Sequence, residues 1–222
     1  MRKIYENVCK FLQSHPLMIS IGYMCIYFPI FFLLEQFCKP RYFIHCALDD
    51  LIPFNEWFVI PYVLWFLFVP GMVLFFLKKS KEDYIKCCKV IYGGMSICLL
   101  IYYLFPNGLS LREPLENRNI CCFIINQLRS ADTPANVCPS IHVSSTVGIL
   151  LVLLNSEKLK SYRKLKAAML VLGTFICIST VVIDQHSVVD AVCGMMLSVV
   201  LFYLVQLSEA PEVEPAFEEI KR

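Results

Sequence analysis

The chain has 222 residues, of which 58% are hydrophobic, with a mean hydropathy of +0.63 and a formal net charge of +2. Charged residues make up 17%, below the ~25% usual in a soluble domain. This composition excludes an ordinary soluble globular protein, and the small net charge provides no field that would recruit nucleic acid. The sequence therefore predicts an all-α, polytopic membrane protein in which residues 1–222 form a single domain.

Six apolar runs predict a bundle of six transmembrane helices, since a span needs ~20 mostly apolar residues. The first run is expected to remain in the mature protein, because it is long and no small-x-small cleavage site follows it. The fourth run is about 15 residues long, so we expect its N-terminal end to include Pro139 and Ser140. The predicted spans are Leu17–Phe37, Trp57–Leu77, Cys88–Phe105, Ile141–Asn155, Leu165–Ile183 and Ser187–Leu207.

The basic residues are divided unequally between the two sides of these spans, and this bias sets the expected topology. Fifteen Lys and Arg residues fall on the side of the termini and five on the other side. Both tails, residues 1–16 and the acidic residues 208–222, are therefore expected in the cytoplasm of a protein of the cell membrane. Trp57, Tyr62 and Trp65, near one end of the second span, are typical of an interfacial aromatic belt.

One segment with chemical potential lies at the mouth of the fourth span, on the non-cytoplasmic side. There His142 follows Pro139 and Ser140. Pro139 suits the first turn of a helix, and Asn136 or Ser140 could cap it. The free N–H groups at such a helix start favour an anion. The alternative is a capped helix with an interfacial histidine that takes no part in chemistry.

A second such segment opens the sixth span, where His186 precedes Asp190 by one helical turn. A carboxylate in this apolar run costs on the order of 3 kcal/mol unless it is paired. His186 is its natural partner, because Asp190 can accept from Nδ1–H and leave Nε2 as a nucleophile. The alternative is a structural pair that ties the helix end. Arg112, in the loop after the third span, is expected at the same membrane face.

These segments resemble two signatures of the type 2 phosphatidic acid phosphatase family, which shares its core with vanadium haloperoxidases. One signature reads Pro-Ser-x-His, and the other reads Ser-Arg, five residues, His, three residues, Asp. The likeness extends over residues 48–206. The matching positions are Pro139, Ser140, His142, Ser179, His186 and Asp190.

The chain departs from this family at the positions that usually carry positive charge. Phe105 stands where the first signature has a lysine, and Glu113 separates Arg112 from Pro114. Thr180 replaces the arginine of the third signature. Two of the family's three phosphate-binding cations are therefore absent, and Arg112 is the candidate for the third. A similarly reduced pattern is seen in the inositol phosphorylceramide synthase and sphingomyelin synthase branch, which keeps phosphotransfer open.

The resemblance implies a reaction that needs neither a metal nor a cofactor. His186 would attack phosphorus to form a phosphohistidine, and Asp190 would fix its tautomer. His142 would protonate the leaving alcohol and then activate water or an acceptor alcohol. The phosphoryl oxygens would be held by backbone amides and by Arg112, Ser140 and Ser179.

We therefore expect a lipid phosphatase that cleaves a lipid phosphate or diphosphate at the extracytoplasmic face, with membrane lipids as its partners. One alternative is a lipid phosphotransferase that moves a phospho-head group to an alcohol. Another is a non-catalytic lipid-binding member of the family. A metal site of two histidines and one carboxylate is formally possible. Asp190 at i+4 is better suited to orient His186 than to bind a metal.

Overall fold

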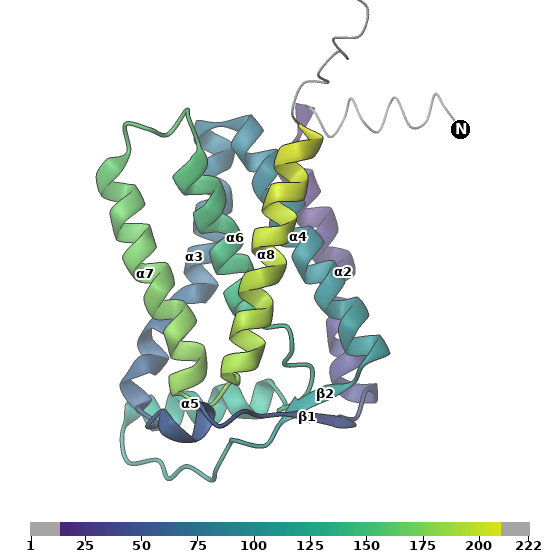
Figure 1. Cartoon of the computed structure of the whole chain (residues 1–222), viewed down its shortest axis with the longest axis vertical. Coiled ribbons are helices and arrows are strands. Elements are labelled where there is room, and N and C mark those ends of the chain that lie inside the picture. Colours follow the sequence, from purple (N-terminus) through teal and green to yellow (C-terminus); the bar gives the residue numbers. More distant parts are fainter. Residues whose placement is uncertain (1–13, 210–222) are drawn as a thin grey trace, which may run out of the picture.

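The computed structural model describes residues 14–209, in which seven α-helices form a bundle with a two-stranded ribbon at one end (Figure 1). Six helices run along the long axis of the bundle, and α5 lies across one end. The helices are α2 (Leu17–Phe37), α3 (Val59–Lys79), α4 (Lys81–Leu104), α5 (Ile120–Ala131), α6 (Ile141–Asn155), α7 (Arg163–Val182) and α8 (Val188–Ser208).

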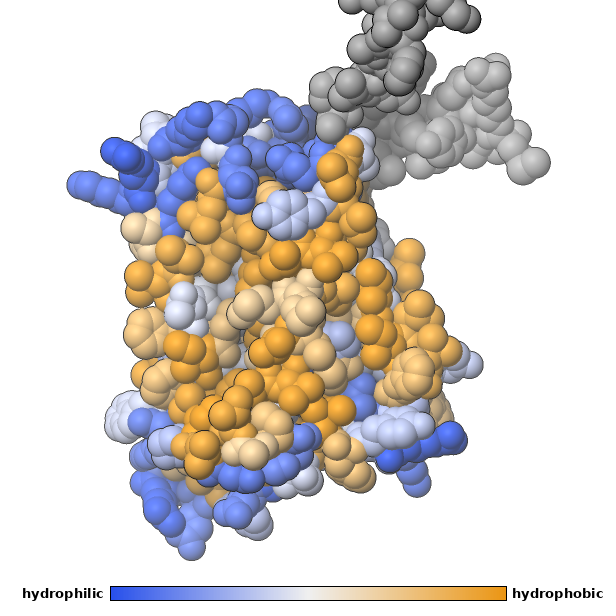
Figure 2. All heavy atoms as spheres, in the orientation of Figure 1, coloured by the Kyte–Doolittle hydropathy of each residue, from blue (hydrophilic) through white to orange (hydrophobic). Residues whose placement is uncertain are grey.

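Five of these helices, α2, α3, α4, α7 and α8, are long and apolar enough to cross a membrane. Their outer faces carry large apolar side chains, such as Phe32, Leu67 and Leu204, that are more than half exposed. On the face in view, Figure 2 shows an apolar band between two hydrophilic ends. A soluble protein rarely exposes so large an apolar surface. The chain is therefore a multi-pass membrane protein.

Six spans were predicted, but only five of the described helices are long enough to cross a membrane. The remaining predicted span, α6, has 15 residues. α6 lies in the middle of the bundle, where it contacts α3, α4, α7 and α8 (Figure 1). Ten of its residues are buried. Since α6 is surrounded by protein rather than lipid, it need not match the thickness of the bilayer alone.

Small residues allow α8 to approach α6 closely at the end that carries the ribbon. A Cβ added to Gly194 would lie 2.5 Å from the backbone oxygen of Ser140, a distance that no side chain tolerates. One turn further, the hydroxyls of Ser144 and Ser198 are 2.9 Å apart. The backbone N–H of Ser140 donates to the carbonyl of Asp190 at 3.0 Å. These contacts fix the start of α6 relative to the start of α8.

The ribbon at this end is the part of the described chain that the all-α expectation missed. Strands β1 (Tyr42–Ile44) and β2 (Asn107–Leu109) pair in parallel. The side chain of Asn107 extends the pairing to the segment before α6, because its Oδ1 accepts from the N–H of Cys138 at 2.8 Å and its Nδ2 donates to the carbonyl of that residue at 2.9 Å. The loops after α2 and α4 therefore support the entrance to α6.

The opposite end of the bundle carries the lysine-rich connections after α3 and α6 (Figure 1). Ion pairs join neighbouring elements there, including Lys89 with Glu209 at 2.8 Å and Lys158 with Glu82 at 2.6 Å. Of the two predicted cytoplasmic tails, residues 1–13 and 210–222 lie outside the described residues.

Candidate active site

His142 lies in the first turn of α6, and the preceding segment determines where that turn begins. Ser140 caps the helix, as expected, and its Oγ accepts from the N–H of Val143 at 3.3 Å. Pro139, predicted to lie inside the first turn, instead precedes the cap. Its carbonyl accepts from the hydroxyl of Tyr102 at 2.6 Å. The helix begins at Ile141, the first residue of the predicted span, and does not extend back to Pro139, because Ser140 has an extended backbone, which suits a capping residue.

His186 lies in the tight turn between α7 and α8. The backbone N–H groups of Gln185 and His186 both donate to the carbonyl of Thr180, at 3.0 and 2.9 Å. On the other side of the turn, Ser187 and Asp190 form a capping box at the start of α8. The imidazole is therefore anchored by the end of one helix and the beginning of the next.

Asp49, far away in the sequence, holds the same turn. Its Oδ2 accepts from the hydroxyl of Ser187 at 2.7 Å and from the N–H of Cys46 at 2.8 Å, and its Oδ1 accepts from the N–H of Val188 at 2.8 Å. Burial acts to raise the pKa of this carboxyl, but the hydrogen bonds outweigh it and the pKa is lowered. Asp49 is therefore an ionised anchor for the segment that carries His186.

The two histidines meet, as the sequence predicts. The ring centroids of His142 and His186 are 5.6 Å apart, and the ring planes are inclined by 60°. Both residues line the same cavity. An edge contact of this kind places both imidazoles beside the same part of the cavity, where one small group can contact each ring.

Asp190 stands beside His186, as its spacing predicts, but its carboxylate is shared. Nδ1 of His186 is 3.4 Å from Oδ2 of Asp190, too far for a strong hydrogen bond. The same oxygen accepts from the backbone N–H of Ser187 at 2.8 Å. Within the described chain, Oδ1 of Asp190 and Nδ1 of His186 have no hydrogen-bond partner. Both groups are thus available to each other through a small movement, which catalytic hydrogen bonds often require.

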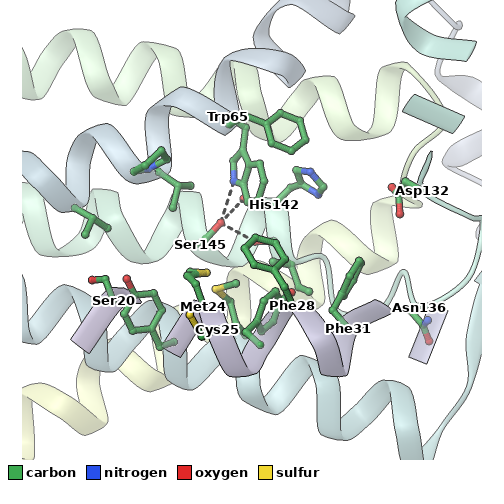
Figure 3. Close-up of a pocket in the computed structure, with 18 of the residues that line it drawn as sticks. Ser20, Met24, Cys25, Phe28, Phe31, Trp65, Asp132, Asn136, His142 and Ser145 are labelled. Atoms are coloured by element: carbon green, nitrogen blue, oxygen red, sulfur yellow. Dashed lines mark hydrogen bonds between the residues drawn. The ribbon is translucent and has the colours of Figure 1, made fainter. Parts of the chain in front are cut away.

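Aromatic side chains of α3 enclose the ring of His142. The ring of Trp65 lies 4.2 Å and that of Tyr62 4.7 Å from it, between centroids. Nε1 of Trp65 donates to Ser145 at 3.0 Å (Figure 3). Of the residues predicted to form an aromatic belt, Trp57 is exposed, whereas Tyr62 and Trp65 pack inside the bundle. That prediction was wrong for these two because hydropathy does not reveal which side of a helix faces its neighbours.

Arg112 reaches the site through two neighbours. Its Nη1 donates to the carbonyl of Asp132 at 2.6 Å, and its Nη2 donates to Oε1 of Gln185 at 2.8 Å. Asp132 and Gln185 line the cavity with the two histidines. Burial raises the pKa of the Asp132 carboxyl, and the charge of Arg112 opposes that rise. The structure thus brings Arg112 next to the site, although sequence reasoning singled out neither Asp132 nor Gln185.

A second arginine, Arg129 of α5, stabilises the same region. Its Nη1 donates to the carbonyl of Glu113 at 2.7 Å, and its Nη2 donates to the carbonyl of Ile183 at 3.2 Å. Nη2 also lies 3.6 Å from the carboxylate of Asp184. Burial lowers the pKa of Arg129. This side chain fastens α5 and the loop before it to the turn between α7 and α8.

Ser140, Ser179 and Thr180 are all buried and use their hydroxyls in the backbone of their own helices. Ser140 caps α6, Ser179 donates to the carbonyl of Ile176 at 2.6 Å, and Thr180 donates to that of Cys177 at 2.8 Å. None of the three lines the cavity. The role of Ser140 and Ser179 as phosphate ligands stays a prediction.

A cavity of about 850 Å³ extends from the histidines between α2 and α3 (Figure 3). Its walls are formed by apolar residues of both helices, and residues of α4 and α6 complete it. The histidine, carboxylate and amide side chains that line it gather at one end. Figure 3 shows His142, Asp132 and Asn136 toward that end and Ser20, Met24 and Cys25 further along α2. The cavity therefore joins a small polar site to a long apolar compartment.

Residues 14–209 contain no group of three or more His, Cys, Asp or Glu side chains arranged to hold a metal ion.

In a comparison with known protein families, residues 115–210 match the model of the PAP2 superfamily. The matched segment contains His142, His186 and Asp190, while Arg112 lies just before it. No curated protein and no solved structure matches the chain.

Proposed function

Because residues 115–210 match the model of the PAP2 superfamily, the family that the two signatures resemble, we propose that this protein is a membrane-embedded lipid phosphatase that acts through a phosphohistidine. The match to this superfamily supports a phosphatase or a related phosphotransferase in general. The lipid substrate, the covalent intermediate and the site's location at the extracytoplasmic face are parts of our proposal.

The observation that carries the proposal is the pair of imidazoles 5.6 Å apart, with a buried carboxylate one turn after His186. Nε2 of His186 attacks phosphorus while the bond to the leaving oxygen breaks. His142 gives that oxygen its proton. His142 then takes a proton from water, whose oxygen attacks phosphorus and releases His186 with inorganic phosphate. Asp190 stabilises the positive charge that His186 gains in the intermediate.

Arg112 is the cation assigned to the phosphoryl oxygens. Its side chain is 9% exposed, so its charge acts in surroundings of low dielectric constant, where electrostatic stabilisation of a transition state is strongest. Bidentate hydrogen bonding to phosphate is the typical use of a guanidinium. Its hydrogen bonds to Asp132 and Gln185 pre-orient it.

The cavity between α2 and α3 supports a lipid as the substrate. A phosphate next to the histidines would have its apolar chain in a compartment lined by residues such as Met24, Phe28 and Val69. These residues belong to helices that are apolar enough to lie in a membrane. A substrate of this kind includes phosphatidic acid-like and polyprenyl phosphates.

A phosphotransferase is the second candidate, and the loss of cations favours it. Phe105 is 58% exposed, and Thr180 directs its hydroxyl to its own helix, so neither replaces the missing charge. In this reaction an alcohol takes the place of water in the second step. A non-catalytic lipid-binding protein is the third candidate, but it gives no reason for the two converging imidazoles.

Phosphate release from lipid phosphates by the purified chain, with and without added alcohols, separates these candidates. We expect release without an alcohol, and His186→Ala is expected to abolish it in a protein that still elutes as a folded species in detergent. Product formed only when an alcohol is present would instead identify the transferase. Full activity of His186→Ala would reject the phosphohistidine, and no turnover by the wild type would favour the lipid-binding protein.

The charge bias of the loops supports cytoplasmic termini and an extracytoplasmic site. A green fluorescent protein fused after Arg222 is expected to fluoresce, because it folds in the cytoplasm, whereas an alkaline phosphatase fused there is expected to be inactive. The opposite pair of results would reverse the orientation.

A further inference from the structure

Gln185, the residue before His186, has a buried amide of which only one half is engaged. Gln185 is 1% exposed and lines the cavity together with His142 and His186. Its Oε1 accepts from Nη2 of Arg112 at 2.8 Å. Its Nε2, which carries two N–H donors, has no hydrogen-bond partner among residues 14–209. Buried donors without a partner are rare and costly, so this one points to a ligand.

The contact with Arg112 determines which way the amide points. A guanidinium has only donors, so the amide oxygen must face it and the NH₂ group must face away. The base of the side chain is fixed as well, because the backbone N–H of Gln185 donates to the carbonyl of Thr180 at 3.0 Å. The donor is thus positioned before any ligand binds, as stabilisation of a developing negative charge requires.

We propose that Nε2 of Gln185 binds the phosphoryl oxygens, beside the phosphorus that His186 attacks; this rests on the proposed function. Thr180 occupies the position of an arginine in the family signature, but its hydroxyl donates to the carbonyl of Cys177. Gln185 therefore provides the donor that Thr180 does not. The positive charge of Arg112 on the amide oxygen polarises the amide and strengthens its N–H groups as donors.

Two variants separate a phosphate ligand from a mere support for Arg112. Gln185→Glu keeps the shape and the oxygen that faces Arg112 but removes both N–H donors. Gln185→Met keeps the approximate volume and removes donor and acceptor together. Asn126→Asp is the matched control, because it makes the same amide-to-acid change on α5, at the same end of the bundle. The amide of Asn126 donates to the carbonyl of Leu115 at 2.8 Å and does not line the cavity.

The probe is orthovanadate, and the measurement is its dissociation constant for the purified full chain in detergent. We expect Gln185→Met to weaken binding by roughly 10- to 100-fold, as for the loss of a hydrogen bond to a charged group. Gln185→Glu should weaken it further, because it places a negative charge against an anion. Asn126→Asp should stay within about twofold, as expected for a substitution away from the site.

If Gln185 only supported Arg112 and did not face the anion, Gln185→Glu would bind orthovanadate about as tightly as the wild type, since its carboxylate would still pair with the guanidinium. That result overturns the inference, even if Gln185→Met fails to fold. Binding and turnover are measured separately. The wild type could bind orthovanadate, and Gln185→Glu could specifically lose that binding, although the wild type releases no phosphate from lipids. This combination would overturn only the proposed function. A wild type that binds no orthovanadate overturns both.

Discussion

Helices α6 and α8 pack tightly, whereas α2 and α3 stand apart on either side of the cavity. Backbone atoms of α8 approach the start of α6 so closely that only glycine fits at position 194. α6 and α8 are in direct contact, whereas α2 and α3 face each other across the cavity that both helices line.

The looser pair is nevertheless fixed at both ends. Near the histidines, Oε1 of Glu35 accepts from the amide of Asn136 at 2.8 Å. Toward the other end, the hydroxyls of Ser20 and Tyr84 are 2.7 Å apart. α2 is thus held at a distance from α3 without filling the space between them. On the proposed function, chemistry would depend on the α6–α8 contact and binding of an apolar chain on the α2–α3 gap.

The largest expected effect comes from disturbing the tight contact. Gly194→Ala places a Cβ 2.5 Å from the backbone oxygen of Ser140, and the start of α6 must move away from α8. We expect phosphatase activity to fall roughly 100-fold, because small misplacements of catalytic groups have effects of that size. We also expect a destabilisation of about 1–3 kcal/mol from overpacking, measured by thermal unfolding in detergent.

Gly71→Ala, in the middle of α3, is the control, because a Cβ there meets nothing within 4 Å. This substitution should leave activity unchanged and stabilise the helix slightly. Equal activity losses in both variants would show that α6 and α8 need no close contact.

The next effect tests the anchor of the turn between α7 and α8. Asp49→Ala leaves the hydroxyl of Ser187 and the N–H of Val188 without their acceptor, which costs about 1–3 kcal/mol. Activity should fall with stability, because the same turn positions His186. Asp50→Ala, which removes only an exposed pair with His45, should change the free energy of unfolding by about 0.5 kcal/mol or less. A larger effect at Asp50 than at Asp49 would contradict the proposed anchor.

A smaller effect is expected from filling the gap. Met24→Trp on α2 adds volume to the cavity wall and should raise KM for a long-chain lipid phosphate roughly 10-fold, within the range for steric changes in an apolar pocket. A short-chain, water-soluble phosphate should be unaffected, because it needs only the polar end. Ile26→Trp on the exposed outer face of α2 is the control. Equal effects on both substrates would show that the apolar compartment does not bind the chain.

Much of this fold follows from local properties of the sequence. The apolar run predicted over Leu17–Phe37 is the helix observed, since the length of such a run is set by the bilayer. The parallel pairing of β1 and β2 was missed, because it joins short segments whose register depends on distant neighbours. The 12-residue helix α5 was missed as well. It is too short and too mixed in polarity to resemble a span.

The sequence predicted only those parts of the site in which the spacing of residues along the chain determines their positions. His186, in the turn before α8, and Asp190, in the first turn of α8, are four residues apart, and His142 falls at the same membrane face once the spans are ordered. Gln185 acts together with Arg112, 73 positions away, and Asp49 with Ser187, 138 positions away. No periodicity links such residues. In the sequence, the only signals were an acidic residue, Asp49, beside an apolar span and a polar residue, Gln185, directly before His186. Neither signal identifies the partner of that residue.

The smallest effect concerns pH at the turn beside His186. Burial raises the pKa of Asp184 to about 6, although Arg129 opposes that rise. The folded protein therefore holds this proton more tightly than the unfolded chain, whose carboxyl titrates near pH 4. As the pH rises from about 4 to 6, this group reduces stability, and the reduction is complete above pH 6. Asp184→Asn should remove that dependence.

Asparagine is suited to this test because Asp184 has a φ of 54°, a conformation that asparagine tolerates. At pH 7.5 we expect the variant to be more stable than the wild type by on the order of 1 kcal/mol, less than the full pKa difference implies because solvent screens this partly exposed carboxyl. Below pH 4 that gain disappears, because the wild-type carboxyl is then neutral too. Thermal unfolding in detergent at the two pH values, with the exposed Glu116→Gln as control, measures the difference. A gain of the same size at both values would show that the carboxyl of Asp184 does not titrate between them. The gain would then come from the preference of asparagine for this backbone conformation rather than from removal of a buried charge.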